Sequence, residues 1–128
     1  AQHLAEVVEP ALSEGNDVIT DRSYGSTLAY QGHGRGQSTD ELMRLAEWAS
    51  GGLLPDLVVL LTVPVDTADG RLGDERDRME REDADFAARV IDGFAVLANA
   101  DPDRWIVIDG AGSIAEVAER VANAVGMK

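Results

Sequence analysis

The stretch Asn16–Gln37, NDVITDRSYGSTLAYQGHGRGQ, organises the interpretation of the whole chain. It runs from a short apolar strand, Val18–Thr20, into an Asp21-Arg22 pair and then into a turn rich in small and hydroxyl-bearing residues. Ligands of α/β proteins lie beyond the carboxyl ends of the strands, so the pair is predicted at a ligand-binding edge. An aspartate there can hold magnesium or its water, and an arginine can fork onto phosphate.

Four polar side chains follow the pair at spacings that suit one helical face, since residues three and four apart are neighbours on a helix. These are Ser26, Thr27, Tyr30 and Gln31. A tyrosine can stack on a base while a threonine and a glutamine hydrogen-bond its edge. The alternative is a polar loop that only caps a helix, because Asp, Ser and Thr are common helix caps.

Taken together, the pattern DR-x-x-x-ST-x-AYQG-x-GRG resembles the thymidylate kinase family in its bacterial form. The segments GGLLPDLVVLL, DRMEREDADF and RWIVIDGAGSIAEVAERV continue the likeness, which covers nearly the whole chain. Two departures stand out. The family opens with a Gly-rich phosphate-binding loop ending in Gly-Lys-Ser/Thr, a motif that this sequence does not contain, and it usually carries an acid where this chain has Thr62.

The resemblance implies a kinase that moves the γ-phosphoryl group of ATP onto dTMP, giving dTDP and ADP. Such a reaction depends on positioning and charge neutralisation more than on covalent chemistry. By resemblance, Arg22 would hold the acceptor phosphate and Asp21 would support the Mg²⁺–phosphate network. The set Ser26, Thr27, Tyr30 and Gln31 would form the thymidine pocket.

The segment from about residue 67 to 85 is dense in charged residues. A charge run is ordinarily a solvated face. The resemblance instead implies a mobile lid whose arginines stabilise the transferring phosphoryl group, and Arg71, Arg76 and Arg78 are the candidates. The planar, permanently charged guanidinium suits phosphate oxygens.

Apolar runs and helical periods alternate along the chain, which predicts a parallel α/β architecture. Strands are expected at Val18–Thr20, Leu57–Leu61 and Trp105–Ile108, the last two buried on both faces. Helices are expected over Ala1–Glu14, behind the capping box that begins at Ser38, over residues 85–97, and behind a second box at Ser113. The last helix is expected to bury four apolar side chains, Ile114, Val117, Val121 and Val125.

The resemblance refines this to the fold of a P-loop nucleoside monophosphate kinase, a parallel sheet with helices on both faces. In that family the P-loop strand lies in the middle of the sheet, between the first two strands seen here. Residues 1–128 are therefore expected to form a single partial domain that lacks this central strand. The resemblance also implies a homodimer, in which Trp48 would be an interface residue; the alternative is that Trp48 packs within its own subunit.

Composition excludes several other classes. The chain has 128 residues, a formal net charge of −13 and no cysteine, so disulfide and cysteine–metal sites are excluded. Strong acidity disfavours a nucleic-acid groove or an anionic membrane surface. No stretch is apolar for long enough to suggest a membrane span, and a cytoplasmic location is expected. His33 has no second ligand at metal spacing and is interpreted as a surface histidine.

Two other functions remain open from the sequence. One is a nucleotide-binding or dimerisation module of the same fold that has lost catalysis, which the missing loop and Thr62 favour. The other is a related P-loop kinase that acts on a different nucleoside or nucleotide, which the AYQG segment disfavours.

Overall fold

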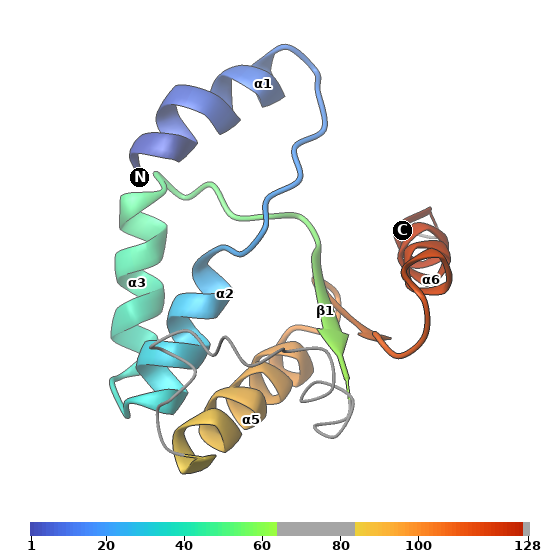
Figure 1. Ribbon diagram of the computed structural model, residues 1–128. Helices are drawn as coiled ribbons and strands as arrows, with labels where there is room; N and C mark the ends of the chain where they lie inside the picture. The colour runs from blue at the N-terminus through green and yellow to red at the C-terminus, as the bar shows by residue number, and fades with distance from the viewer. Residues whose placement is uncertain (64–83, 127–128) are drawn as a thin grey trace, which may run out of the picture.

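The computed structural model describes residues 1–63 and 84–126. Figure 1 shows their arrangement, with helices on both sides of two short strands. In chain order the elements are η1 (Leu4–Val8), α1 (Glu9–Ser13), α2 (Tyr24–Thr27), η2 (Leu28–Gly34), α3 (Thr39–Ala49), β1 (Val58–Thr62), α5 (Ala84–Ala100), β2 (Trp105–Asp109) and α6 (Ile114–Gly126), where η marks a π-helical segment.

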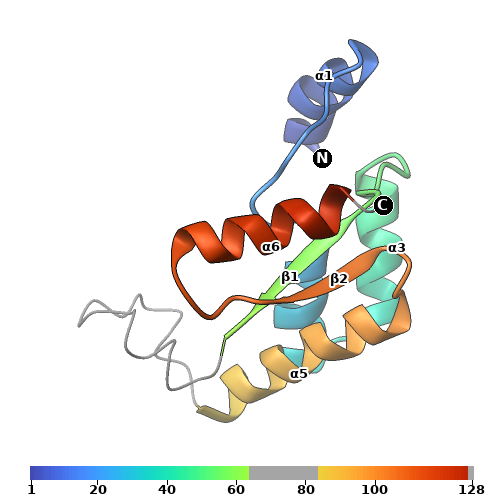
Figure 2. The same ribbon diagram turned by 90° about the vertical axis from the view of Figure 1, so that its right-hand side faces the viewer.

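The two strands β1 and β2 are parallel, as predicted. Val58 is paired with Trp105, and the register runs on to Thr62 opposite Asp109. Figures 1 and 2 show α6 on one side of the strands and α2, α3 and α5 on the other. The predicted α/β architecture, with a parallel sheet between helical layers, is therefore confirmed.

The third predicted strand is not formed. Val18–Thr20, called the extended segment below, forms neither a helix nor a paired strand, and the side chain of Ile19 is 98% exposed. A strand exists only through the hydrogen-bonded ladder with a neighbour. Within the described ranges the sheet consists of β1 and β2 alone, so this segment finds no partner there.

Local sequence signals set the helix ends. The Ser38 hydroxyl accepts a hydrogen bond from the Glu41 backbone N–H at 3.3 Å, which confirms the first capping box as the start of α3. At α6 the box is reciprocal: the Ser113 N–H donates to the Glu116 carboxylate at 2.7 Å, and the Glu116 N–H donates to the Ser113 hydroxyl at 3.4 Å. Caps of this kind satisfy backbone donors that a helix leaves unpaired.

The core lies where η2 crosses α5. Ala29, Phe86 and Val90 are its buried members, and three partly buried side chains pack against them, namely Tyr30, Phe94 and Leu97. Glycine makes the approach close: a Cβ on Gly93 would lie 2.6 Å from the Cβ of His33. His33 is consequently half-buried against α5, and its interpretation as a surface residue is wrong.

Much apolar surface of the sheet and of α6 remains exposed. Exposed fractions are 55% for Val107, 91% for Ile114 and 45% for Val125, while Val117 and Val121 are only partly covered. The predictions that both strands are buried on two faces and that α6 buries its apolar stripe are therefore wrong for the described residues. Burial needs a second layer on each face, and among residues 1–63 and 84–126 the sheet has only two strands.

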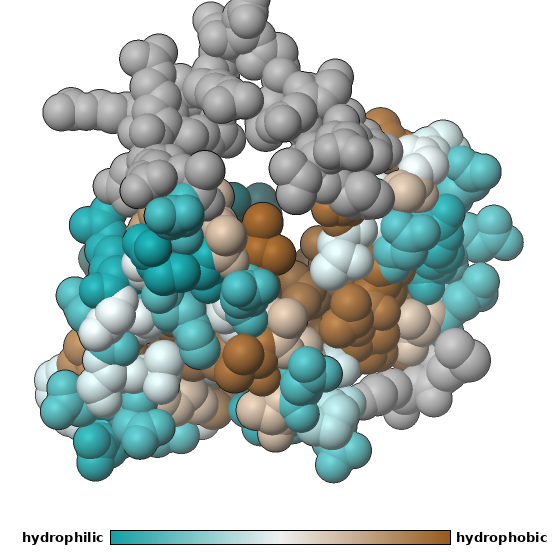
Figure 3. All heavy atoms as spheres, turned by 90° about the horizontal axis from the view of Figure 1, so that it is seen from below, coloured by the Kyte–Doolittle hydropathy of each residue, from teal (hydrophilic) through white to brown (hydrophobic). Residues whose placement is uncertain are grey.

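Figure 3 shows the consequence on one face of the molecule, where apolar side chains gather in a hollowed band between hydrophilic edges. Monomeric proteins seldom expose large contiguous apolar areas. The exposed surface therefore agrees with the prediction that the P-loop kinase fold is incomplete in these residues. None of the described helices combines the length and the apolar character that crossing a bilayer requires.

Candidate functional site

The predicted site begins with a sharp backbone turn at Arg22. Its φ of 67° lies in the left-handed region, which few non-glycine residues occupy. The turn ends the extended segment and is followed directly by α2, whose N-cap is Ser23. It brings the guanidinium carbon of Arg22 to 5.8 Å from the ring centroid of Tyr30, within the range of a cation–π contact.

Tyr30 is fixed from its other sides by two aromatic rings of α5. Its ring centroid lies 6.1 Å from that of Phe86 and 6.3 Å from that of Phe94, both in edge-to-face geometry. Its backbone carbonyl accepts a hydrogen bond from the Arg35 N–H at 3.1 Å, a π-helical spacing. Single π-helical turns are often found at functional sites.

A hollow of about 120 Å³ joins Arg22 and Ser26 to the sheet. Thr20 lies on one side of it, and Val58 and Trp105 line another. Binding sites for small molecules usually enclose ~300–1,000 Å³, so this hollow is too small to hold a nucleotide by itself. The described residues therefore do not enclose a nucleotide-sized site at this hollow.

The other predicted pocket residues are less closely involved. Thr27 is exposed and Gln31 is half-buried, and neither is among the lining residues of this hollow. Both still flank Tyr30 in the helical run from α2 into η2, as the spacing predicted. Their roles as ligands of a base remain predictions.

Asp21, the predicted metal residue, is exposed beside Arg22 at the end of the extended segment. The described residues contain no group of three or more metal-ligating side chains. Magnesium nevertheless fits such a place, because it is commonly bound by one or two carboxylates together with phosphate oxygens and water.

The three predicted catalytic arginines, Arg71, Arg76 and Arg78, lie outside the described residues, as does most of the predicted lid. Thr62, at the end of β1, donates its hydroxyl to the Ile108 carbonyl at 3.4 Å. Thr62 thus contacts the neighbouring strand β2.

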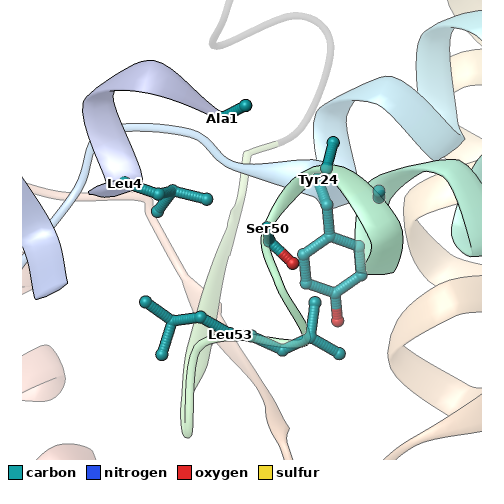
Figure 4. A pocket seen from close by; sticks show the side chains of 8 residues that line it. Ala1, Leu4, Tyr24, Ser50 and Leu53 are labelled. Carbon is teal, nitrogen blue, oxygen red and sulfur yellow. The ribbon is translucent and has the colours of Figure 1, made fainter. Parts of the chain in front are cut away.

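A second hollow, of about 180 Å³, lies behind the site (Figure 4). Side chains from three places converge on it in Figure 4: Leu4 of η1, Tyr24 of α2 and Leu53 after α3. A hydrogen bond with the Tyr24 side chain raises the pKa of Arg104 above its ordinary value. The lining of this hollow is chiefly apolar, so it offers few groups that could hold a phosphate.

Sequence reasoning missed the contributions of Gly25, Trp105 and Arg89 to the shape of the site. A Cβ on Gly25 would lie 2.7 Å from Cη2 of Trp105, so α2 rests directly on the buried indole ring at the start of β2. Arg89 of α5 donates its Nε–H to the Gly34 carbonyl at 2.9 Å, at the end of η2. A glycine inside an otherwise helical stretch is the signal that could have indicated the close contact of Gly25 with Trp105.

Comparison with known proteins agrees with this geometry. The sequence profile described as thymidylate kinase matches residues 1–121. The chain belongs to the thymidylate kinase family. The thymidylate kinase of Neisseria gonorrhoeae (strain NCCP11945) is 46% identical over 118 residues, which are 91% of this chain and 57% of that protein. The thymidylate kinase of Desulforudis audaxviator is 48% identical over 110 residues, or 85% and 50% of the two chains.

A solved structure supports the same assignment. The crystal structure of thymidylate kinase from Ehrlichia chaffeensis matches with a TM-score of 0.74 and 28% identity. The match covers 98% of this chain but 57% of the solved one. The predicted thymidylate kinase fold is thus confirmed, and the chain spans little more than half the length of the relatives it matches.

Proposed function

We propose that this chain belongs to a thymidylate kinase that transfers the γ-phosphoryl group of ATP to dTMP. The observation that carries the proposal is the contact between Arg22 and Tyr30 at the end of the extended segment. A guanidinium, which can bind phosphate, and an aromatic ring, which can stack on a base, lie side by side there in a member of the thymidylate kinase family. A nucleoside monophosphate presents matching groups, an anionic phosphate and a flat base joined by a sugar.

Arg22 supplies the phosphate end of the acceptor site in this proposal. Its guanidinium is held over the Tyr30 ring, so less freedom is lost when it forks onto phosphate oxygens. Ser26, in the hollow beside it, offers a hydroxyl to the same ligand. The exposed Thr27 and the half-buried Gln31 provide hydrogen-bonding groups for the base.

Magnesium and the lid complete the acceptor side. Asp21 would hold the ion or its water, and bound Mg²⁺ supplies charge neutralisation for the phosphates. Arg71, Arg76 and Arg78 are proposed to close over the transferring group. The 128 residues contain no Gly-Lys-Ser/Thr loop, so we assign this chain the acceptor site and the lid, and not the cradle for the ATP phosphates.

We further propose a homodimer in the cytoplasm. Trp48 is 81% exposed and Leu45 is 58% exposed, three residues apart on α3. The alternative that Trp48 packs within its own subunit is not what the described residues show. Tryptophan is enriched in protein interfaces, and this pair supports α3 as the contact between copies.

The test compares two ligands in one variant. In the protein as its gene encodes it, Tyr30→Ala should weaken dTMP binding more than ATP binding in calorimetry. Stacking of an aromatic side chain on a base is worth roughly 1–3 kcal/mol. Glu119→Ala, at an exposed position of α6, is the control and should change neither affinity.

Three outcomes would contradict the proposal. Equal weakening of both ligands by Tyr30→Ala would remove the acceptor-site assignment. Binding of dTMP without any phosphoryl transfer would favour the alternative of a module that has lost catalysis. Tighter binding of another nucleoside monophosphate would favour the alternative of a related P-loop kinase that acts on a different nucleotide.

A further inference from the structure

Arg89 lies in the second turn of α5, and its side chain reaches the backbone at the end of η2. Its Nε–H donates to the backbone carbonyl of Gly34, the last residue of η2, at 2.9 Å. The two residues are 55 positions apart in the chain. Carbonyls at the end of a helix have no partner within it, so this bond satisfies a group that would otherwise be unpaired.

The same guanidinium also contacts the aromatic cluster. The guanidinium carbon of Arg89 lies 6.0 Å from the ring centroid of Phe86, and that of Arg35 lies 5.8 Å from it. The Phe86 ring in turn meets Tyr30 edge to face. One arginine of α5 is thus joined to Tyr30 along two routes, through the backbone end of η2 and through Phe86.

The interface around this arginine leaves little room for adjustment. A Cβ on Gly34 would lie 2.7 Å from Cε2 of Phe86 and 2.9 Å from Cγ2 of Val90. Phe86 and Val90 are both buried. A displacement of the end of η2 therefore moves against closely packed side chains, because protein interiors are dense and contain few voids.

We infer that Arg89 is a positioning residue for the nucleotide site: it holds Tyr30 in its binding orientation by tying the end of η2 to α5. The inference rests on the proposed function for the identity of the ligand. Arg89 itself does not touch the nucleotide; it acts through Gly34 and Phe86. Its removal should change how well Tyr30 binds a base more than it changes the stability of the rest of the domain.

The first test is a double-mutant cycle on dTMP affinity, in the protein as its gene encodes it. Arg89→Ala should weaken dTMP binding roughly tenfold or more, the low end of what a hydrogen bond from a charged donor is worth. In a Tyr30→Ala background the same change should have little effect, because residues that act as one unit are not additive. Arg89→Lys keeps the positive charge and a hydrogen-bond donor but not the planar guanidinium, and it should recover part of the loss. Glu119→Ala, at an exposed position of α6, should leave the affinity unchanged.

The second test needs no ligand. Amide hydrogen exchange should accelerate at the N–H groups of Arg35 and Gln37, which bond the carbonyls of Tyr30 and Gln31, in Arg89→Ala. The Gly110 N–H, which bonds the Thr62 carbonyl in the sheet, should keep its protection. The exchange rates at Arg35 and Gln37 in Arg89→Lys should lie between those of the wild-type protein and those of Arg89→Ala.

Each result decides a different claim. If wild-type protein binds dTMP and the effects of Arg89→Ala and Tyr30→Ala simply add, the positioning role is overturned. Uniform loss of protection, including at Gly110, would also overturn it, since Arg89 would then be only a general stabiliser. If wild-type protein binds no dTMP, the proposed function fails, and the exchange pattern at Arg35 and Gln37 still decides the positioning role.

Discussion

Replacing Gly25 by alanine tests the contact that connects the site to the sheet. Gly25 is buried in the short helix α2, between Arg22, the predicted phosphate ligand, and Ser26, a predicted residue of the thymidine pocket. An added Cβ would lie 2.7 Å from Cη2 and 3.1 Å from Cζ2 of Trp105, whose side chain is only 6% exposed. The indole ring cannot rotate away into solvent without losing its own burial.

The magnitude follows from these distances. Carbon atoms pack best at about 3.5–4.0 Å, so roughly 1 Å must be absorbed by moving α2 or the ring. Overpacking of this kind costs about 1–3 kcal/mol. Alanine returns up to about 1 kcal/mol because it favours helix more than glycine does. We expect the free energy of unfolding to fall by about 1–2 kcal/mol.

The assay is urea unfolding, in which the midpoint should fall while the slope m stays unchanged. Trp105→Phe removes the benzo ring atoms that the new Cβ would meet. In a double-mutant cycle Gly25→Ala should therefore cost less in the Trp105→Phe background, with a coupling of about 0.5–3 kcal/mol. Gly126→Ala is the control, since nothing lies within 4 Å of a Cβ at that position.

The kcat/KM for dTMP reports the functional side of the same contact. Displacing α2 by about 1 Å moves Arg22 and Ser26 together, and misplacements of that size can cost ~100-fold in catalytic efficiency. An unchanged unfolding midpoint in Gly25→Ala, or equal costs in the two Trp105 backgrounds, would refute the reasoning that α2 rests on this ring.

Four further predictions follow from caps, charges and the sequence. Ser38→Ala should lower the free energy of unfolding by about 1 kcal/mol in urea unfolding, since it removes an N-cap. Hydrogen bonds from the N–H and hydroxyl of Ser113 lower the pKa of Glu116. The contribution of Glu116 to stability is therefore present above the unfolded pKa of about 4.3 and is lost as the pH falls through the folded pKa. Glu116→Gln should flatten the dependence of the unfolding midpoint on pH in that range. Arg76→Ala or Arg78→Ala should lower kcat with little change in the KM for dTMP, and full kcat in both variants would return the charge run to a solvated surface. The 128-residue chain alone should show no dTMP-dependent ADP release, because it lacks the loop that cradles ATP phosphates, and dTMP-dependent release from this chain would contradict the prediction.

Local features of the sequence determined much of the architecture. Capping boxes and apolar periods indicated α3, α5 and α6, and two apolar runs indicated β1 and β2. These elements depend on interactions between residues close together in the sequence, so they do not require knowledge of the tertiary structure. The likeness of DR-x-x-x-ST-x-AYQG to a known family likewise needed only the order of residues, and the family comparison confirmed it.

The tertiary structure decided what depends on contacts between distant segments. Val18–Thr20 has the composition of a strand, but pairing requires a neighbour that the described residues do not provide. Val107 and Ile114 are apolar yet exposed, because burial is a property of what lies opposite and not of the residue.

The site divides in the same way. The sequence indicated Arg22 and Tyr30 as candidates, but only the fold brings α5 against η2. Phe86 and Phe94 then contact the tyrosine ring from more than fifty residues away, and Arg89 bonds the end of η2. No local pattern encodes that approach. It arises because glycines leave room for close packing, which only the assembled helices reveal.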